Sequence, residues 1–254
     1  MRKIYLVPNF VTTANLFCGF YAIISTLHQE FVVAAWAILA AGVFDMLDGR
    51  IARMAKATSQ FGVEYDSLSD LLSFGAAPAV LLYQWALEPF ERLGWLAAFL
   101  FLACGALRLA RFNVSSAILP KNYFQGLPIP IAAGMVATFI IFNKISAWPA
   151  GKENFVLFLT FGLASLMVST IRFPSMKEFN WRSRASFGYL LIGVLAMILI
   201  AVKPEVTLFL MGVCYISVSL VWNLVRLLTG SSVATGSDKA KIGNGSTSSN
   251  YGKK

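Results

Sequence analysis

A hairpin rich in carboxylates joins two long apolar runs of the chain. It spans residues 45–70 and reads DMLDGRIARMAKATSQFGVEYDSLSD. Asp45 and Asp48 are three residues apart at the end of the first run, and Asp66 and Asp70 are four apart at the start of the second. On a helix, residues three or four apart share a face. The connection is short, so we expect the four carboxylates to converge at one end of a helical hairpin.

The rest of the chain has few charges. Of 254 residues, 57% are apolar and 13% charged, whereas a soluble domain has about 25% charged residues. Crossing a bilayer takes roughly 20 apolar residues in a helix. Runs of about this length lie near residues 11–27, 31–52, 67–87, 94–112, 128–146, 154–173, 187–203 and 206–228. We therefore predict an all-α, polytopic integral membrane helical bundle of about eight transmembrane helices, which argues against a water-soluble enzyme.

Composition also suggests the domain organisation. We expect residues 1–228 to form one transmembrane domain and residues 229–254, rich in Gly, Ser, Thr and Lys, to form a disordered cytoplasmic tail. The first run lacks a small-residue cleavage pattern, so we expect it to remain in the mature protein. Cys18, Cys104 and Cys214 lie in apolar runs without the spacing of a metal site. We expect them to be buried thiols.

Positive charge is distributed unevenly between the loops. If the amino terminus is cytoplasmic, only four of the 21 Lys and Arg residues fall in outer loops: Arg92, Lys144, Lys152 and Lys203. The positive-inside rule then predicts a multi-pass protein of the cell membrane with both termini and the carboxylates on the cytoplasmic side. The net charge of +9 therefore requires no nucleic acid partner.

Carboxylates at the ends of membrane spans need compensation, because burying them is costly. The nearby Arg50, Arg53 and Lys56 could neutralise them, or divalent metal could bind. Oxygen ligands favour Mg²⁺ or Mn²⁺, and two ions would suit a displacement at phosphorus. A structural ion-pair cluster and a cation pathway remain alternatives.

The residues between the carboxylates complete the pattern D-x2-D-G-x2-A-R-x8-G-x3-D-x3-D without departure. This pattern resembles the signature of the CDP-alcohol phosphotransferases, membrane enzymes that move a phosphatidyl or similar group from a CDP-linked lipid to an alcohol. The resemblance implies that Asp45, Asp48, Asp66 and Asp70 bind divalent metal, Mg²⁺ or Mn²⁺, as two ions. It also implies that Asp70 is the catalytic base.

Five other residues of this segment are candidates for binding the nucleotide and diphosphate. Gly49 and Ala52 lack bulk, so a pyrimidine and ribose could lie against the helix, although close helix packing would explain them too. Arg53 could donate a fork of hydrogen bonds to a diphosphate or anchor the helix at the interface. Ser59 could hold a phosphate or cap a helix, and the resemblance implies that it contacts the nucleotide. Gly62 belongs to the same motif and is assigned to the same site.

The amino-terminal pattern P-N-x2-T-x2-N-L-x2-G-F begins at Pro8. Physically it is typical of a helix start, with Asn9 as a possible cap and with Thr12 and Asn15 on one side. It resembles the bacterial and archaeal type of phosphatidylserine synthases within this family, where this region lines the nucleotide site. The resemblance implies that Asn9, Thr12 and Asn15 bind the nucleotide.

Two arginines end the fourth predicted span. Arg108 and Arg111 are three residues apart, followed by Asn113. They could anchor the span at the cytoplasmic face, or they could bind the carboxylate of a serine substrate with help from Asn113. Pro128 and Pro130 stand at the start of the fifth span, and we interpret them as helix-start residues.

Taken together, the resemblance implies transfer of the phosphatidyl group from CDP-diacylglycerol to the hydroxyl of L-serine, with release of CMP, in phospholipid biosynthesis. Alternatives are another acceptor (glycerol 3-phosphate or an inositol phosphate), an archaeal lipid donor, or a divalent-cation transporter. A homodimer is expected from the resemblance and from small residues such as Gly42 and Gly105 within spans. The lone His28 lies in an outer turn far from the carboxylates, so we expect it to have no catalytic role.

Overall fold

The computed structural model describes residues 6–54, 59–115, 123–146, 152–174 and 202–228. In these ranges the chain is almost entirely helical, which confirms the predicted helical membrane bundle. The elements are α1 (Leu6–Leu27), α2 (Phe31–Met54), α3 (Gln60–Asp70), π-helix η2 (Leu71–Ala76), α4 (Ala77–Leu82), π-helix η3 (Tyr83–Leu87), 3₁₀-helix η4 (Glu88–Phe90), α5 (Arg92–Ser115), β1 (Tyr123–Gln125), α6 (Ile129–Ser146), α7 (Lys152–Val168), β2 (Arg172–Pro174) and α9 (Pro204–Leu228).

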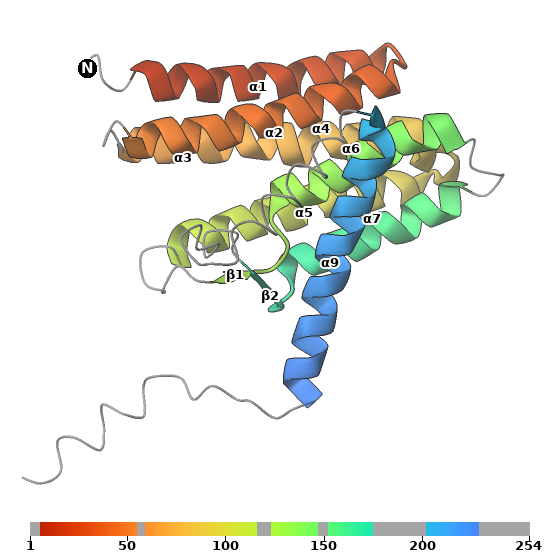
Figure 1. The fold of residues 1–254 in the computed structure, drawn as a ribbon. Helices are drawn as coiled ribbons and strands as arrows, with labels where there is room; N and C mark the ends of the chain where they lie inside the picture. Colours follow the sequence, from red (N-terminus) through yellow and green to blue (C-terminus); the bar gives the residue numbers. More distant parts are fainter. Residues whose placement is uncertain (1–5, 55–58, 116–122, 147–151, 175–201, 229–254) are drawn as a thin grey trace, which may run out of the picture.

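The helices pack as long, neighbouring rods (Figure 1). Helices α1 and α2 lie side by side along their length, and α3 also packs against α1. Helix α2 contacts α6, α5 contacts α7, and α9 lies across α6. Because α2 and α3 follow one another through a short connection, the end of α2 and the start of α3 come to the same end of the bundle.

Small residues allow this close packing. Ala34, Ala41, Ala77 and Ala97 are fully buried where helices meet, as expected for helices that associate in a membrane. Large apolar side chains instead cover the outside, as a lipid-facing surface requires. Four helical segments of the described chain are long and apolar enough to cross a membrane: Asn9–Leu27, Phe31–Ile51, Arg92–Val114 and Pro204–Val225.

The predicted spans agree with these elements where the structure describes them, except in two places. The sixth predicted span, residues 154–173, is too long, because α7 ends at Val168 and Arg172–Pro174 forms β2. The third span is a run of short helical elements from Gln60 to Leu87, in which two π-helical turns interrupt the α-helix. Such turns widen the helix and often occur at functional sites. The seventh predicted span, near residues 187–203, and the predicted tail, residues 229–254, lie outside the described residues except for Val202 and Lys203.

The prediction for the cysteines is correct only in part. None of the three forms a disulfide, and Cys104 is buried, but Cys18 is only half-buried and Cys214 is exposed. The prediction of a buried thiol is wrong for Cys214, because an apolar run in a membrane helix has the same composition whether it faces protein or lipid.

A small antiparallel pair ties two connections together. Strands β1 and β2 pair Tyr123 with Pro174 and Gln125 with Arg172. The next residue, Gly126, has φ of 78°, and a Cβ there would collide with the carbonyl oxygen of Met167. Only glycine fits this position. Helix α6 then begins at Ile129, so Pro128 and Pro130 stand at a helix start, as predicted.

Candidate active site

Three carboxylates form a cluster where the end of α2 meets α3. One oxygen each of Asp45, Asp48 and Asp66 lies within 4.8 Å of the others, and we call this group the carboxylate cluster. Asp48 is buried and the other two are half-buried. The short connection between α2 and α3 thus brings three of the four predicted carboxylates into one group.

The cluster has the donor set of a divalent-cation site. Oδ1 of Asp66 is buried and has no hydrogen-bond partner among the described residues. Asp66 also lies within reach of the negative charges of Asp48 and Asp45. Three crowded carboxylates with an unpartnered oxygen fit a hard cation such as Mg²⁺ or Mn²⁺. These residues could therefore bind a metal ion.

The fourth carboxylate, Asp70, stands beside the cluster on the next turn of α3. It is 9% exposed and interacts electrostatically with Asp45 and Asp66. Its Oδ1 accepts a hydrogen bond of 3.1 Å from Nδ2 of Asn15 in α1. Asp70 is therefore held by a neutral donor and is not part of the three-residue group.

Helix α1 contacts the carboxylates through a second side chain. The hydroxyl of Thr12 donates to Oδ2 of Asp48 over 3.0 Å. Thr12 and Asn15 are both buried. The structure thus directs two of the predicted nucleotide-binding side chains toward the aspartates.

Two serines that the sequence patterns did not single out complete this region. The hydroxyls of Ser69 and Ser73 donate to the main-chain carbonyl oxygens of Thr12 and Asn15, each over 3.0 Å. Ser73 also lies against Gly19, where a Cβ would collide with it. The serines are four residues apart and share a face with Asp66 and Asp70, and this periodicity is the signal that could have found them.

Three of the predicted nucleotide residues lie close together around the start of α3. Ser59 is the N-cap of α3, where its hydroxyl oxygen accepts a 3.0 Å hydrogen bond from the Gly62 amide. The helix-capping interpretation of Ser59 is therefore observed, and the hydroxyl proton remains a donor. A Cβ placed on Gly62 would lie 3.6 Å from Oδ1 of Asn9. Asn9, Ser59 and Gly62 therefore gather at one place.

Gly49 has open space beside it. A Cβ added there would meet no atom of the described residues within 4 Å. Close helix packing therefore does not explain the glycine, which leaves room for a flat group as the motif suggested. Ala52 and Arg53 lie on the next turn of α2, and their side chains are outside the described part of the structure.

The predicted serine-binding residues occupy different surroundings on α5. Arg108 is buried, its Nε has no partner among the described residues, and it interacts electrostatically with Asp70 and Asp45. Arg111 instead donates from Nη1 to the carbonyl oxygen of Val168, over 3.1 Å, at the end of α7. Asn113 donates to the Ser67 hydroxyl over 2.9 Å.

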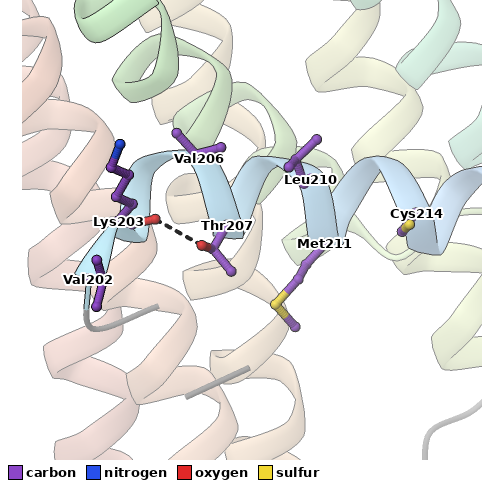
Figure 2. Close-up of a pocket in the computed structure, with 7 residues that line it drawn as sticks. All are labelled: Val202, Lys203, Val206, Thr207, Leu210, Met211 and Cys214. Atoms are coloured by element: carbon purple, nitrogen blue, oxygen red, sulfur yellow. Dashed lines mark hydrogen bonds between the residues drawn. The ribbon is translucent and has the colours of Figure 1, made fainter. Parts of the chain in front are cut away.

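One apolar groove of about 430 Å³ runs along α9 (Figure 2). Its lining includes Val206, Leu210 and Met211, with Lys203 at one end and Cys214 at the other. No carboxylate lines it, so it is separate from the cluster. His28 lies in the exposed turn between α1 and α2, at the opposite end of α2 from the aspartates.

The fold and this site together define a helical membrane protein with an acidic centre that could bind a metal ion. A family model described as CDP-alcohol phosphatidyltransferase matches residues 5–171, a range that includes every carboxylate of the site. The chain therefore belongs to the CDP-alcohol phosphatidyltransferase family.

Individual relatives agree with this assignment. The chain is 34% identical over 229 residues to a CDP-diacylglycerol--serine O-phosphatidyltransferase of Helicobacter pylori, covering 90% of this chain and 93% of the relative. It is 38% identical over 172 residues to the Bacillus subtilis protein of that name, covering 68% and 92%. It is 36% identical over 170 residues to an archaetidylserine synthase of Methanothermobacter thermautotrophicus, covering 66% and 69%.

Proposed function

We propose that this protein transfers the phosphatidyl group of CDP-diacylglycerol to the hydroxyl oxygen of L-serine, forming phosphatidylserine and releasing CMP. The convergence of Asp45, Asp48 and Asp66 within 4.8 Å, inside a membrane bundle of this family, carries the proposal. The names of the relatives support serine as the acceptor.

The carboxylates of this site fit divalent metal. We propose that Asp45, Asp48, Asp66 and Asp70 would hold two ions, Mg²⁺ or Mn²⁺. When bound, such ions would supply positive charge for the diphosphate and for the leaving CMP oxygen.

Asp70 is the proposed base. As the serine oxygen forms a bond to phosphorus and the bond from phosphorus to the CMP oxygen breaks, the hydroxyl proton passes to the carboxylate of Asp70. A carboxylate is a weak base for an alcohol, so positioning contributes more than basicity. Asn15 already occupies Oδ1 of Asp70, which leaves Oδ2 to accept the proton.

The groups around the cluster would bind the rest of the donor. We propose that the nucleotide lies over Gly49 and Ala52, with Arg53 donating to the diphosphate. The start of α3 would lie at the edge of this nucleotide, where Asn9, Ser59 and Gly62 gather.

Arg108 is the proposed partner of the serine carboxylate. It is a buried cation with an unpartnered Nε, and it stands near Asp70. Arg111 and Asn113, the other two predicted acceptor residues, donate to α7 and α3, so we propose that they chiefly hold α5 in place.

The membrane orientation and assembly are also part of the proposal. The bias of Lys and Arg places both termini and the site at the cytoplasmic face of the cell membrane. Residues 1–228 form the catalytic domain, residues 229–254 form a tail, and two copies pair as a homodimer.

A headgroup screen tests the proposal. Purified protein in detergent, with CDP-diacylglycerol and Mn²⁺ or Mg²⁺, is supplied with serine, glycerol 3-phosphate or inositol phosphate, and CMP and the lipid product are measured. We expect CMP release with serine only, and phosphatidylserine as the product. Release with a phosphorylated acceptor would reassign the substrate, and faster turnover of a CDP-linked archaeal lipid would reassign the donor. If no acceptor supports CMP release, and the protein reconstituted into vesicles instead carries divalent cations across the membrane, the result would favour the transporter.

A further inference from the structure

Helix α1 supplies polar but uncharged groups to the carboxylates. The hydroxyl of Thr12 donates to Asp48 and the amide of Asn15 donates to Asp70, over 3.0 and 3.1 Å. Thr12 is 4% exposed and Asn15 is 0% exposed. Because both donors are buried, water does not compete for either hydrogen bond.

The same two residues of α1 are held a second time through their main chain. Ser69 donates to the carbonyl oxygen of Thr12, and Ser73 donates to that of Asn15. The close contact between Gly19 and Ser73 keeps the helices together one turn further on. Helix α1 thus has one register against α3, and this register places both donors at the carboxylates.

Each of the two side chains donates a hydrogen bond to a carboxylate of the protein. The only proton of the Thr12 hydroxyl is donated to Asp48, and an amide proton of Asn15 is donated to Asp70. Oδ1 of Asn15 is buried without a partner among the described residues. One of the two amide protons of Asn15 is thus donated to Asp70 inside the protein, and this buried contact suits a side chain that orients the carboxylate.

We propose that Thr12 and Asn15 are positioning residues rather than nucleotide contacts. Thr12 orients Asp48 for binding a divalent cation, and Asn15 fixes Asp70 through Oδ1 so that Oδ2 faces the reaction. The part that concerns Asn15 rests on the proposed function. The part that concerns Thr12 requires only that the cluster binds metal.

Mn²⁺ binding to the purified full chain, measured by electron paramagnetic resonance without nucleotide or lipid, tests the role of Thr12. Groups that orient metal ligands typically change affinity by about 10- to 100-fold when removed. We expect Thr12→Val to raise the Mn²⁺ dissociation constant at least 10-fold and Thr12→Ser to stay within about 3-fold of wild type. A nucleotide contact would leave this constant unchanged, and that result would overturn the proposal.

Ser69→Ala is the matched control, because it removes a hydrogen bond to the main chain of Thr12 and touches no carboxylate. We expect it to lower the melting temperature while the Mn²⁺ dissociation constant stays within about 2-fold of wild type. An equal loss of Mn²⁺ affinity in Ser69→Ala and Thr12→Val would show that only helix packing matters, and would also overturn the proposal.

Steady-state kinetics test the role of Asn15. We expect Asn15→Leu to lower kcat at least 10-fold while KM for CDP-diacylglycerol stays within about 3-fold, because the base is misplaced and the donor site is intact. A rise in that KM with unchanged kcat would make Asn15 a nucleotide contact. If the wild-type protein makes no phosphatidylserine, the proposed function fails, whereas the Mn²⁺ result still decides the role of Thr12.

Discussion

The two sides of the site hold their polar groups in opposite ways. On the side formed by α1 and α3, Thr12, Ser69 and Ser73 all make buried hydrogen bonds that link the helices. On the side formed by α5, Arg108 is as deeply buried, yet its Nε has no partner among the described residues. A buried unpartnered donor is costly.

This difference distinguishes a preorganised part of the site from the part where we propose that the acceptor binds. The carboxylates must keep fixed positions in order to act at phosphorus, so an interhelical network is useful there. If Arg108 binds the serine carboxylate as proposed, it must keep a donor available for it. Arg111, three residues further along α5, shows the contrast because it is already bonded to the end of α7.

Among the changes considered, loss of the proposed base on the preorganised side should lower activity most. Asp70→Asn keeps the shape of the side chain but cannot accept the proton, so we expect kcat to fall by about 10²- to 10⁴-fold. Nucleotide affinity should change little. CMP release and calorimetric CDP binding measure the two effects. A variant that keeps more than about a third of the wild-type rate would contradict the assignment of Asp70 as base.

A change at Arg108 should weaken binding of the acceptor and leave binding of the donor lipid almost unchanged. A charge-assisted hydrogen bond contributes about 1.5 to 3 kcal/mol, so we expect Arg108→Ala to raise KM for serine at least 10-fold. KM for CDP-diacylglycerol should remain within about 3-fold, and Arg108→Lys should restore only part of the loss.

Arg111→Ala is the matched control on the same helix. It removes the hydrogen bond to the end of α7, so we expect a lower melting temperature and a KM for serine within about 3-fold of wild type. A 10-fold rise in that KM would show that both arginines bind the acceptor.

A methyl group at Gly49 tests whether the nucleotide lies against the backbone of α2. Because an added Cβ meets no described atom within 4 Å, Gly49→Ala should stabilise α2 by about 0.5 to 1 kcal/mol. If the nucleotide lies against this backbone, CDP binding in the presence of Mn²⁺ should weaken. Thermal unfolding and calorimetry measure the two effects, and unchanged CDP affinity would place the nucleotide elsewhere.

Removing residues 229–254 should have the smallest effect. This segment lacks the apolar side chains needed to bury itself against the bundle. We expect activity and membrane insertion close to those of the full chain, as measured by specific activity in isolated membranes. Loss of more than half the activity of well-folded protein would make the tail part of the enzyme.

The sequence predicts the membrane helices and the meeting of the carboxylates well, because both follow from local periodicity. Asp45 and Asp48 share one helix face and Asp66 lies on the next helix, so a short connection is enough to bring them together. Periodicity also places Thr12 and Asn15 on one side of α1. It does not say what faces them, and their hydrogen bonds to Asp48 and Asp70 depend on how α1 packs.

The exposure of Cys214 and the pairing of β1 with β2 escape prediction for a related reason. An apolar helix in a membrane has no solvent-facing polar stripe that distinguishes its buried face. A three-residue strand depends on a partner far along the chain: Gln125 pairs with Arg172, 47 positions later. Such contacts belong to the assembled bundle and have no local signal.

Exchange of labelled CMP into CDP-diacylglycerol tests the central claim most directly. If serine attacks phosphorus itself, with Asp70 taking its proton, wild-type protein with metal but without serine should incorporate no label. With serine present, each CMP released should match one phosphatidylserine formed. Rapid exchange in the absence of serine would reveal a covalent phosphatidyl-enzyme and would contradict direct transfer.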